Sequence, residues 1–177
     1  MNIFYLDESP SQCAQWMVDK HVVKMILETA QLLSTAHRVL DGVMSVDTSG
    51  PRKKKVYKLN DERDLILYNT THINHPSAVW ARSSVENYNW LVDHLFALSA
   101  EYTYRYNKTH ATMTKMGYEI QSPPHSLTEW GWTPMPSCMD PQYIIGEDPI
   151  ANYRNYYKYG KTSMHKWKKR EAPEWIN

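Results

Sequence analysis

The fold is decided by residues 19 to 40, which read DKHVVKMILETAQLLSTAHRVL. At about 100° of rotation per residue, apolar or small side chains cover most of the surface of a helix with this sequence. Six polar residues share one arc about 100° wide, which we call the polar stripe: His21, Lys24, Glu28, Gln31, Thr35 and Arg38. Because so narrow a polar arc leaves little surface for water, the pattern predicts a largely buried central helix.

The polar stripe has two interpretations. In the first, it is a thin solvent-facing strip in which Lys24 and Glu28 pair four residues apart, which stabilises a helix by about 0.2–0.5 kcal/mol. In the second, it lines a cleft, because burying a histidine, a carboxylate and an arginine is costly unless these groups are paired or used. In such a cleft Glu28 stays ionised beside a cation, and it is available as a base or as a stabiliser of positive charge.

Helix-start signals mark further helices. Three pairs combine a capping residue with a proline at the first helical position: Ser9-Pro10, His75-Pro76 and Asp148-Pro149. The first helix is expected to break near Asp19, and the long helix that follows is expected to stop at Gly42. Residues 76–106 contain no Pro or Gly and predict continuous helix, and residues 107–118 predict a separate short one.

The remaining segments have the composition of loops. Residues 43–60 mix Gly, Pro, Ser, Thr and Lys and predict a basic loop, and no alternating strand pattern exceeds four residues. Residues 122–149 contain six prolines and predict an extended loop or lid. Residues 162–177 predict a basic tail. The expected architecture is therefore mostly α, a compact single-domain helical bundle over residues 1–177 with a long Pro-rich loop.

Composition excludes several classes of protein. A chain of 177 residues with 42% hydrophobic side chains needs no metal or disulfide to fold. A mean hydropathy of −0.64 and the absence of long apolar runs argue against a membrane-spanning helix and a signal peptide. Two cysteines, Cys13 and Cys138, are too few for a disulfide framework. We therefore expect a cytoplasmic protein, in the host cytoplasm if a phage encodes it.

The net charge of +1 conceals two basic runs. Residues 52–58 carry five Lys and Arg side chains. Residues 152–170 contain no acid and seven basic residues: Arg154, Lys158, Lys161, Lys166, Lys168, Lys169 and Arg170. The second run is interleaved with Tyr and Trp, as in a groove that neutralises phosphates and stacks bases, or else it is a solvated basic tail.

Other constellations carry less chemistry. His72 and His75 lie in no recognised zinc motif, and no Gly-rich phosphate loop is present, so we expect no metal and no cofactor. Arg82 follows a helix start and is a candidate phosphate ligand. Glu101 and Arg105, four residues apart, are most simply part of a solvated helix face.

The triplet Asp19-Lys20-His21, followed by Glu28 seven residues after the histidine, resembles the phage endonuclease V family of pyrimidine-dimer DNA glycosylases. The tail sequence YRNYYKYGK, residues 153–161, is similar to the Tyr-, Lys- and Trp-rich tail of that family. The resemblance implies a compact helical bundle, with Glu28 as the catalytic carboxylate and His21 as a residue that organises the site or binds DNA. The chain as a whole also resembles phage-encoded proteins.

Two positions depart from the family pattern. The family has an arginine directly before its catalytic glutamate, where this chain has Leu27. The family's nucleophile is the α-amine exposed by removal of the initiator methionine, but Asn2 is bulky enough to leave Met1 in place. Lys24 is another candidate amine, but its neighbour Glu28 favours the unreactive ammonium form. We therefore expect water activated by Glu28 to be the nucleophile.

The sequence thus predicts a DNA glycosylase-like enzyme that hydrolyses the glycosidic bond of a damaged or modified base. The expected catalytic residues are Glu28, His21 and Lys24. The expected nucleic-acid or phosphate ligands are Arg38, Arg82, Arg154, Lys158, Lys161, Lys168 and Lys169. The alternatives are an enzyme acting on free nucleotides, with Arg38, Arg82 and Lys24 around one phosphate, or a non-enzymatic phage inhibitor or binding protein.

Overall fold

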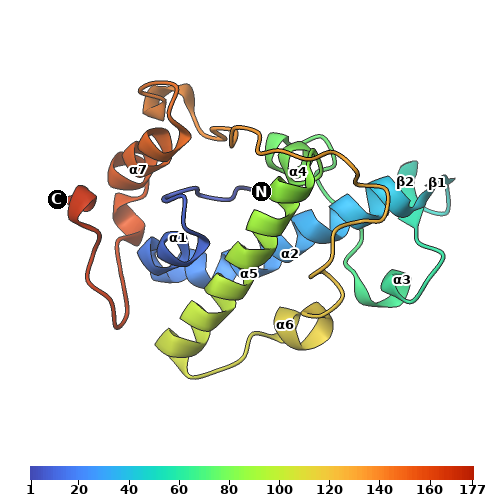
Figure 1. Cartoon of the computed structure of the whole chain (residues 1–177), viewed down its shortest axis with the longest axis horizontal. Helices are drawn as coiled ribbons and strands as arrows, with labels where there is room; N and C mark the ends of the chain where they lie inside the picture. The colour runs from blue at the N-terminus through green and yellow to red at the C-terminus, as the bar shows by residue number, and fades with distance from the viewer.

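Two long helices pack across one another at the centre of the protein, in a computed structural model that describes residues 1–177 (Figure 1). They are α2 (Asp19–Asp41) and α5 (Val85–Tyr106). Thirteen residues of α2 are buried, among them every residue from Leu32 to Arg38. The prediction of a mostly α protein with a largely buried central helix is therefore confirmed.

The other elements surround this pair. Five shorter helices are α1 (Pro10–Trp16), α3 (Arg63–Ile66), α4 (Pro76–Ala81), α6 (Ala111–Met116) and α7 (Pro149–Gly160). Three turns of 3₁₀ helix are η1 (Pro141–Tyr143), η2 (Thr162–Met164) and η3 (Glu174–Ile176). A hairpin of two strands, β1 (Val43–Asp47) and β2 (Lys54–Lys58), lies with α3 at one end of the molecule, and α7 and the C-terminus lie at the other (Figure 1). None of these helices has the length and apolar character that crossing a bilayer requires.

The predicted helix starts are confirmed by their caps. Ser9 accepts a hydrogen bond from the backbone N–H of Gln12, and Asp148 accepts one from Ile150. The imidazole of His75 accepts one from Ser77. The break before Asp19 and the stop at Gly42 also occur as expected. These signals are reliable because the cap and the donor that it satisfies are only two or three residues apart.

Residues 76–106 were predicted to form one continuous helix, but they form two. The chain leaves helical geometry at Arg82, and the hydroxyl of Ser84 caps α5 by accepting from the N–H of Asn87. The absence of Pro and Gly therefore did not guarantee continuity, because a serine cap starts a new helix without either residue.

Residues 43–60 form a β-hairpin where a loop was predicted. Strands β1 (Val43–Asp47) and β2 (Lys54–Lys58) pair antiparallel, with Val43 opposite Lys58 and Asp47 opposite Lys54. All five residues of β1 are exposed, and no residue of β2 is fully buried. An alternating pattern arises when one face of a strand is buried, so a hairpin with no buried face leaves none in the sequence.

Residues Glu101 and Arg105 are buried rather than solvated, which corrects the prediction of an exposed helix face. Arg105 is 1% exposed and bonds to Glu101 and to Asp19 at 2.6 and 2.9 Å. Arg170 adds two further bonds to the Glu101 carboxylate. The basic tail is thus docked on α5.

Candidate functional site

The two ends of the polar stripe differ in their surroundings. Near the N-terminal end of α2, Lys24 is exposed and Glu28 is half-buried, beside the partly exposed Val23 and Leu27. From Leu32 to Arg38 every residue of α2 is buried. The stripe is therefore open to solvent only around Glu28.

Glu28 is accessible and paired. Its Oε1 lies 3.0 Å from Nζ of Lys24, and the two side chains are 15% and 67% exposed respectively. The carboxylate is therefore shielded from most of the solvent while it remains reachable from the surface. The hydrocarbon part of Lys24 lies on the outside, so the ion pair can open without disturbing the core.

His21 is a core residue of α2, seven residues before Glu28. Its ring stacks on Phe4 at a centroid distance of 4.2 Å, and its Nδ1 hydrogen-bonds to the hydroxyl of Tyr157. Burial, together with the charges of Lys161 and Lys24, lowers the pKa of His21 to about 3. His21 is therefore neutral at physiological pH, and it connects the N-terminal segment to α2 and α7.

The N-terminal segment is held in an unusual conformation. The Oδ1 of Asn2 accepts hydrogen bonds from the N–H of Ile3 and from the hydroxyl of Tyr153, and its Nδ2 donates to the carbonyl of Cys138. Phe4 has a φ of 57°, in the left-handed region that non-glycine residues rarely adopt. Backbone strain of this kind is frequently concentrated at functional sites. These contacts fix the position of Met1.

The imidazole of His75 is influenced by the charges of both the Met1 amine and Glu28. Burial lowers the pKa of His75, the charges of the Met1 amine and of His72 lower it further, and the Glu28 carboxylate opposes them. These groups act on one imidazole, so they lie in one neighbourhood. Figure 1 shows the N-terminus beside α4, the helix that His75 caps.

A basic groove leads away from His75. It has a volume of about 640 Å³ and runs between β2 and the segment that precedes α4. Its lining includes Lys53, Lys54 and Lys55 on one side and Thr70, His72 and His75 on the other. Thr35 of the polar stripe holds that second side in place, because its hydroxyl exchanges hydrogen bonds with the backbone of Thr71. The groove therefore joins the first basic run to the Glu28 neighbourhood.

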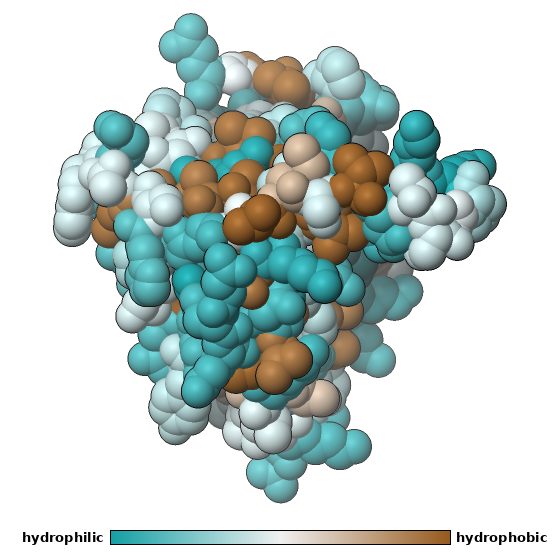
Figure 2. Space-filling model, turned by 90° about the vertical axis from the view of Figure 1, so that its right-hand side faces the viewer, coloured by the Kyte–Doolittle hydropathy of each residue, from teal (hydrophilic) through white to brown (hydrophobic).

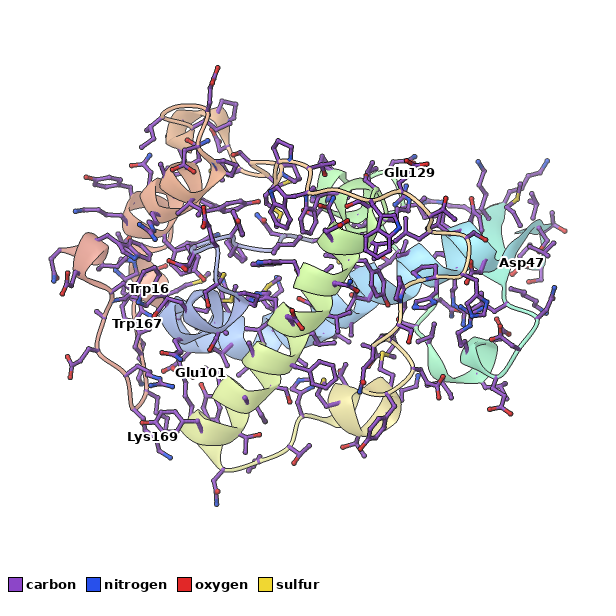
Figure 3. All side chains as sticks on the ribbon, in the orientation of Figure 1. Trp16, Asp47, Glu101, Glu129, Trp167 and Lys169 are labelled. Carbon is purple, nitrogen blue, oxygen red and sulfur yellow. The ribbon has the colours of Figure 1, made fainter.

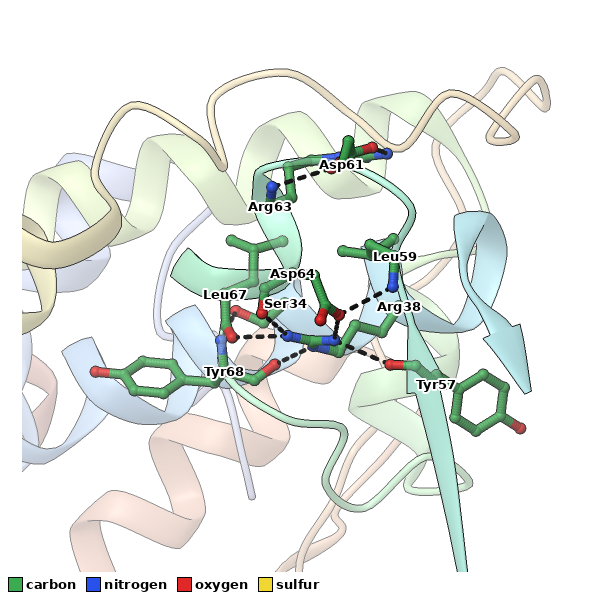
Figure 4. Close-up of polar contacts among 9 residues, drawn as sticks. All are labelled: Ser34, Arg38, Tyr57, Leu59, Asp61, Arg63, Asp64, Leu67 and Tyr68. Atoms are coloured by element: carbon green, nitrogen blue, oxygen red, sulfur yellow. Dashed lines mark hydrogen bonds and ion pairs between the residues drawn. The ribbon is translucent and has the colours of Figure 1, made fainter. Parts of the chain in front are cut away.

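Arg38 does not reach the groove. Its guanidinium donates to the carbonyls of Tyr57, Asp64, Leu67 and Tyr68 and to the Asp64 carboxylate at 2.6 Å (Figure 4). Arg38 is 3% exposed. The predicted phosphate-binding role is therefore replaced by a structural one, in which Arg38 fixes the base of the hairpin. A phosphate clamp of Arg38, Arg82 and Lys24, as required by the free-nucleotide alternative, is not formed.

Two other predicted cations lie closer to the site. Lys161 stands over the rings of Tyr156 and Phe4, at 4.5 and 5.8 Å from their centroids, and its charge acts on His21. Arg82 is half-buried and donates from Nη1 to the carbonyl of Ala78. Burial lowers the pKa of Arg82, which the nearby Tyr57 of β2 partly offsets.

The remaining predicted cations belong to the opposite end of the molecule. Arg154 stacks on Trp16 and bonds to Asp7, and Lys158 donates to the carbonyl of Asn177. Lys168 stands over the ring of Tyr106, and Lys169 donates to the carbonyl of Tyr104. In Figure 3, Lys169 lies at one end of the molecule and Asp47 of the hairpin lies at the other. The structure does not bring these four cations together with Glu28.

Sequence reasoning missed the contributions of Met1, His72 and His75 to this neighbourhood, and it did not place the first basic run beside Glu28. These groups come from segments far apart along the chain. The basic run itself was therefore the only signal of the groove in the sequence.

The protein is mostly α-helical, with an accessible carboxylate on its central helix and a separate lysine-lined groove that ends at His75, and such a groove attracts polyanions. The family model for pyrimidine dimer DNA glycosylase matches residues 1–114, and the chain belongs to this family. The match includes Glu28, the hairpin and His75. Searches of curated proteins and of solved structures gave no match.

Proposed function

We propose that the protein is a DNA glycosylase that hydrolyses the glycosidic bond of a damaged or modified base, with Glu28 as its catalytic carboxylate. The observation that carries the proposal is the position of Glu28, which is accessible on α2 and acts on His75 at the end of the basic groove, in a chain of the pyrimidine dimer DNA glycosylase family. Membership of this family favours DNA over free nucleotides as the substrate.

The proposed chemistry uses the charge of Glu28. As the bond between the sugar C1′ and the base nitrogen breaks, its electron pair leaves with the base and positive charge develops on the sugar. The Glu28 carboxylate stabilises that charge. It also accepts a proton from the water molecule whose oxygen forms the new bond to C1′. Lys24, 3.0 Å away, orients the carboxylate, and His21 positions the segment that carries Met1.

The proposed DNA contacts divide into two groups. We assign the phosphates next to the reacting nucleotide to Lys53, Lys54 and Lys55 in the groove, to Arg82 and to Lys161, which stands over the ring of Phe4. The second group lies on α7 and the tail that follows it, at the end of the molecule away from the hairpin, and is assigned to more distant phosphates of a long duplex: Arg154, Lys158, Lys168 and Lys169.

The experiment is base excision from a duplex oligonucleotide that contains one cis-syn thymine dimer. Wild-type protein is expected to cut the glycosidic bond of one thymine and leave an abasic sugar, seen as strand breakage in alkali, while the thymine stays attached to its neighbour through the dimer. Glu28→Gln is expected to leave no abasic sugar, whereas Glu62→Gln, which makes the same change at an exposed carboxylate elsewhere, is expected to behave as wild type. Equal turnover by Glu28→Gln would remove Glu28 from the mechanism. Duplex binding without any excision would favour the non-enzymatic alternative.

Borohydride reduction separates the water mechanism from an amine nucleophile. A covalent imine between protein and DNA is trapped by reduction, and a hydrolytic reaction leaves nothing to trap. We expect no cross-linked product. A cross-link that disappears when the α-amine is blocked would identify that amine as the nucleophile, and one that disappears in Lys24→Ala would identify Lys24. Either result would overturn the water mechanism and retain the glycosylase function.

A further inference from the structure

The hairpin β1–β2 is unusual because it contributes almost nothing to the core. Val43, Met44 and Val46 are 60%, 48% and 52% exposed. The base of the hairpin is nevertheless firmly attached, since the buried Arg38 donates to the carbonyl of Tyr57 in β2 and to four acceptors in residues 64–68. The hairpin is exposed although the buried Arg38 holds its base in place, so we expect it to have a role other than stabilising the core.

The charge of the hairpin is strongly biased. Residues 52–58 supply five cations, and within the hairpin only Asp47 is acidic. Asp47 lies opposite Lys54 in the strand register, so it offsets a single one of these charges. Lys53, Lys54 and Lys55 also line the groove that ends at His75, whose imidazole is influenced by the charge of Glu28. The positive side of the ribbon therefore continues along the groove as far as His75.

The strand register defines the two faces of the ribbon. Met44 is paired with Tyr57 and Val46 with Lys55, so these four side chains share one face. The other face carries Val43, Ser45, Asp47, Lys54, Val56 and Lys58. Figure 2 views the molecule from the hairpin end and shows apolar side chains next to hydrophilic ones on this surface. Each face thus offers cations for phosphates and short apolar groups for base edges.

We propose that this hairpin inserts into the major groove of duplex DNA next to the nucleotide held at Glu28. The proposal rests on the proposed glycosylase function. A two-stranded ribbon has the width that the major groove of B-DNA admits, about 12 Å, and exposed apolar side chains at that depth contact the methyl groups of thymine. The lysines contact the phosphates along both edges of the groove. Arg38 is a positioning residue, because it sets the direction of the ribbon without touching DNA.

The first test measures duplex binding as a function of salt, in the Glu28→Gln background so that turnover does not interfere. The probe is a duplex with one cis-syn thymine dimer. Replacing Lys54 and Lys55 together by Gln should reduce the slope of log K against log salt by about 1.8, since each lost phosphate contact reduces it by about 0.9. The matched control is Lys108→Gln with Lys166→Gln, two exposed lysines for which no side-chain hydrogen bond is present, and it should keep the wild-type slope. An equal change in both double variants would overturn the proposal.

The second test identifies the groove. Dimethyl sulfate methylates guanine N7, which lies in the major groove. Bound protein should protect guanines placed beside the dimer, and the Lys54, Lys55 double variant should lose that protection. Binding without N7 protection would show that the hairpin does not enter the major groove, and the glycosylase proposal would stand. No duplex binding in any variant would instead remove the proposed function together with this inference.

Discussion

Glu28 and Arg38 lie on the same polar stripe of α2, but they have opposite structural roles. Glu28 is reachable from solvent, has one ion-pair partner and acts through its charge on His75, which lines the basic groove. Arg38, ten residues further on, is sealed by five hydrogen-bond donations to acceptors in β2, α3 and the turn that follows. A narrow polar arc on a buried helix therefore predicts that its charged side chains have partners. It does not reveal whether those partners are other protein groups or solvent.

The largest expected effect is at the open end. Glu28→Gln should lower the rate of base excision by about 10²–10³-fold or more, because the amide cannot stabilise developing positive charge. The free energy of unfolding should change by less than about 1 kcal/mol, since only a partly exposed ion pair is lost. Single-turnover excision and urea denaturation measure the two quantities. A large loss of stability would mean that Glu28, like Arg38, has a structural role.

The next effect is at the closed end. Arg38→Met should lower the free energy of unfolding by about 3–5 kcal/mol, because Asp64 and several buried carbonyls lose their partner. Arg63→Met provides a graded comparison, as Arg63 bonds to Asp41 and Asp61 but is more exposed than Arg38. Urea denaturation at pH 7 is the measurement. If Arg38→Met is as stable as wild type, then Arg38 does not anchor the hairpin.

A third prediction concerns the pH dependence of stability, which two buried histidines of α2 cause, His21 and His37. Burial lowers the pKa of His21 to about 3 and that of His37 to about 4, and the Arg63 guanidinium contributes to the second shift. Arg63 donates to Nδ1 of His37, so the proton of this neutral ring is on Nε2, which faces the Tyr88 hydroxyl. An unfolded histidine gains its proton near pH 6.5, whereas these two remain neutral in the fold to well below that pH.

The unfolded state therefore binds more protons than the fold between about pH 6.5 and 4, and stability should decrease as the pH falls through this window. Each histidine contributes up to about 1.4 kcal/mol per pH unit. Urea denaturation at pH 6.5, 5.5 and 4.5 tests this. His37→Gln should flatten the dependence, while His72→Gln, at an exposed position, should not. An unchanged dependence in His37→Gln would show that His37 is already protonated in the fold.

The smallest expected effect is that of Lys24→Gln. This change removes an exposed partner of Glu28, so stability should change by less than about 0.5 kcal/mol. Excision should decrease only a few-fold, because the carboxylate keeps its charge and loses only an orienting contact. A loss as large as that of Glu28→Gln would give Lys24 a direct chemical role and would weaken the water mechanism.

Local signals in the sequence located much of the fold correctly. The starts of α1, α4 and α7 depend on a cap and a proline that are adjacent in the chain, and the burial of α2 follows from its own periodicity. The break before α5 was missed because a serine cap is a weaker mark than a proline. The hairpin was missed because neither of its faces is buried, so its strands carry no alternation.

The site was less accessible to such reasoning. Glu28 was identified from its arc on α2 and from a family resemblance, but the groove beside it depends on Lys54, on His75 and on the amine of Met1. The cations of residues 152–170 suggested a binding surface, yet the structure engages Arg154 with Trp16 and Arg170 with Glu101. Tyr and Trp next to cations have the same composition whether they stack on bases or on the protein's own arginines.

By itself, the sequence determined the mostly α architecture, the buried character of α2 and the one arc that holds its polar residues, because these follow from rotation per residue and from caps within a few residues. Only the tertiary structure decided which polar residues stay open. Arg38 and Arg105 are closed by acceptors up to about ninety residues away in the chain, whereas Glu28 has a single ion-pair partner, the exposed Lys24, and remains reachable from the surface. The free energy of a charged side chain depends on the partners that folding brings to it, and sequence separation carries no information about those partners.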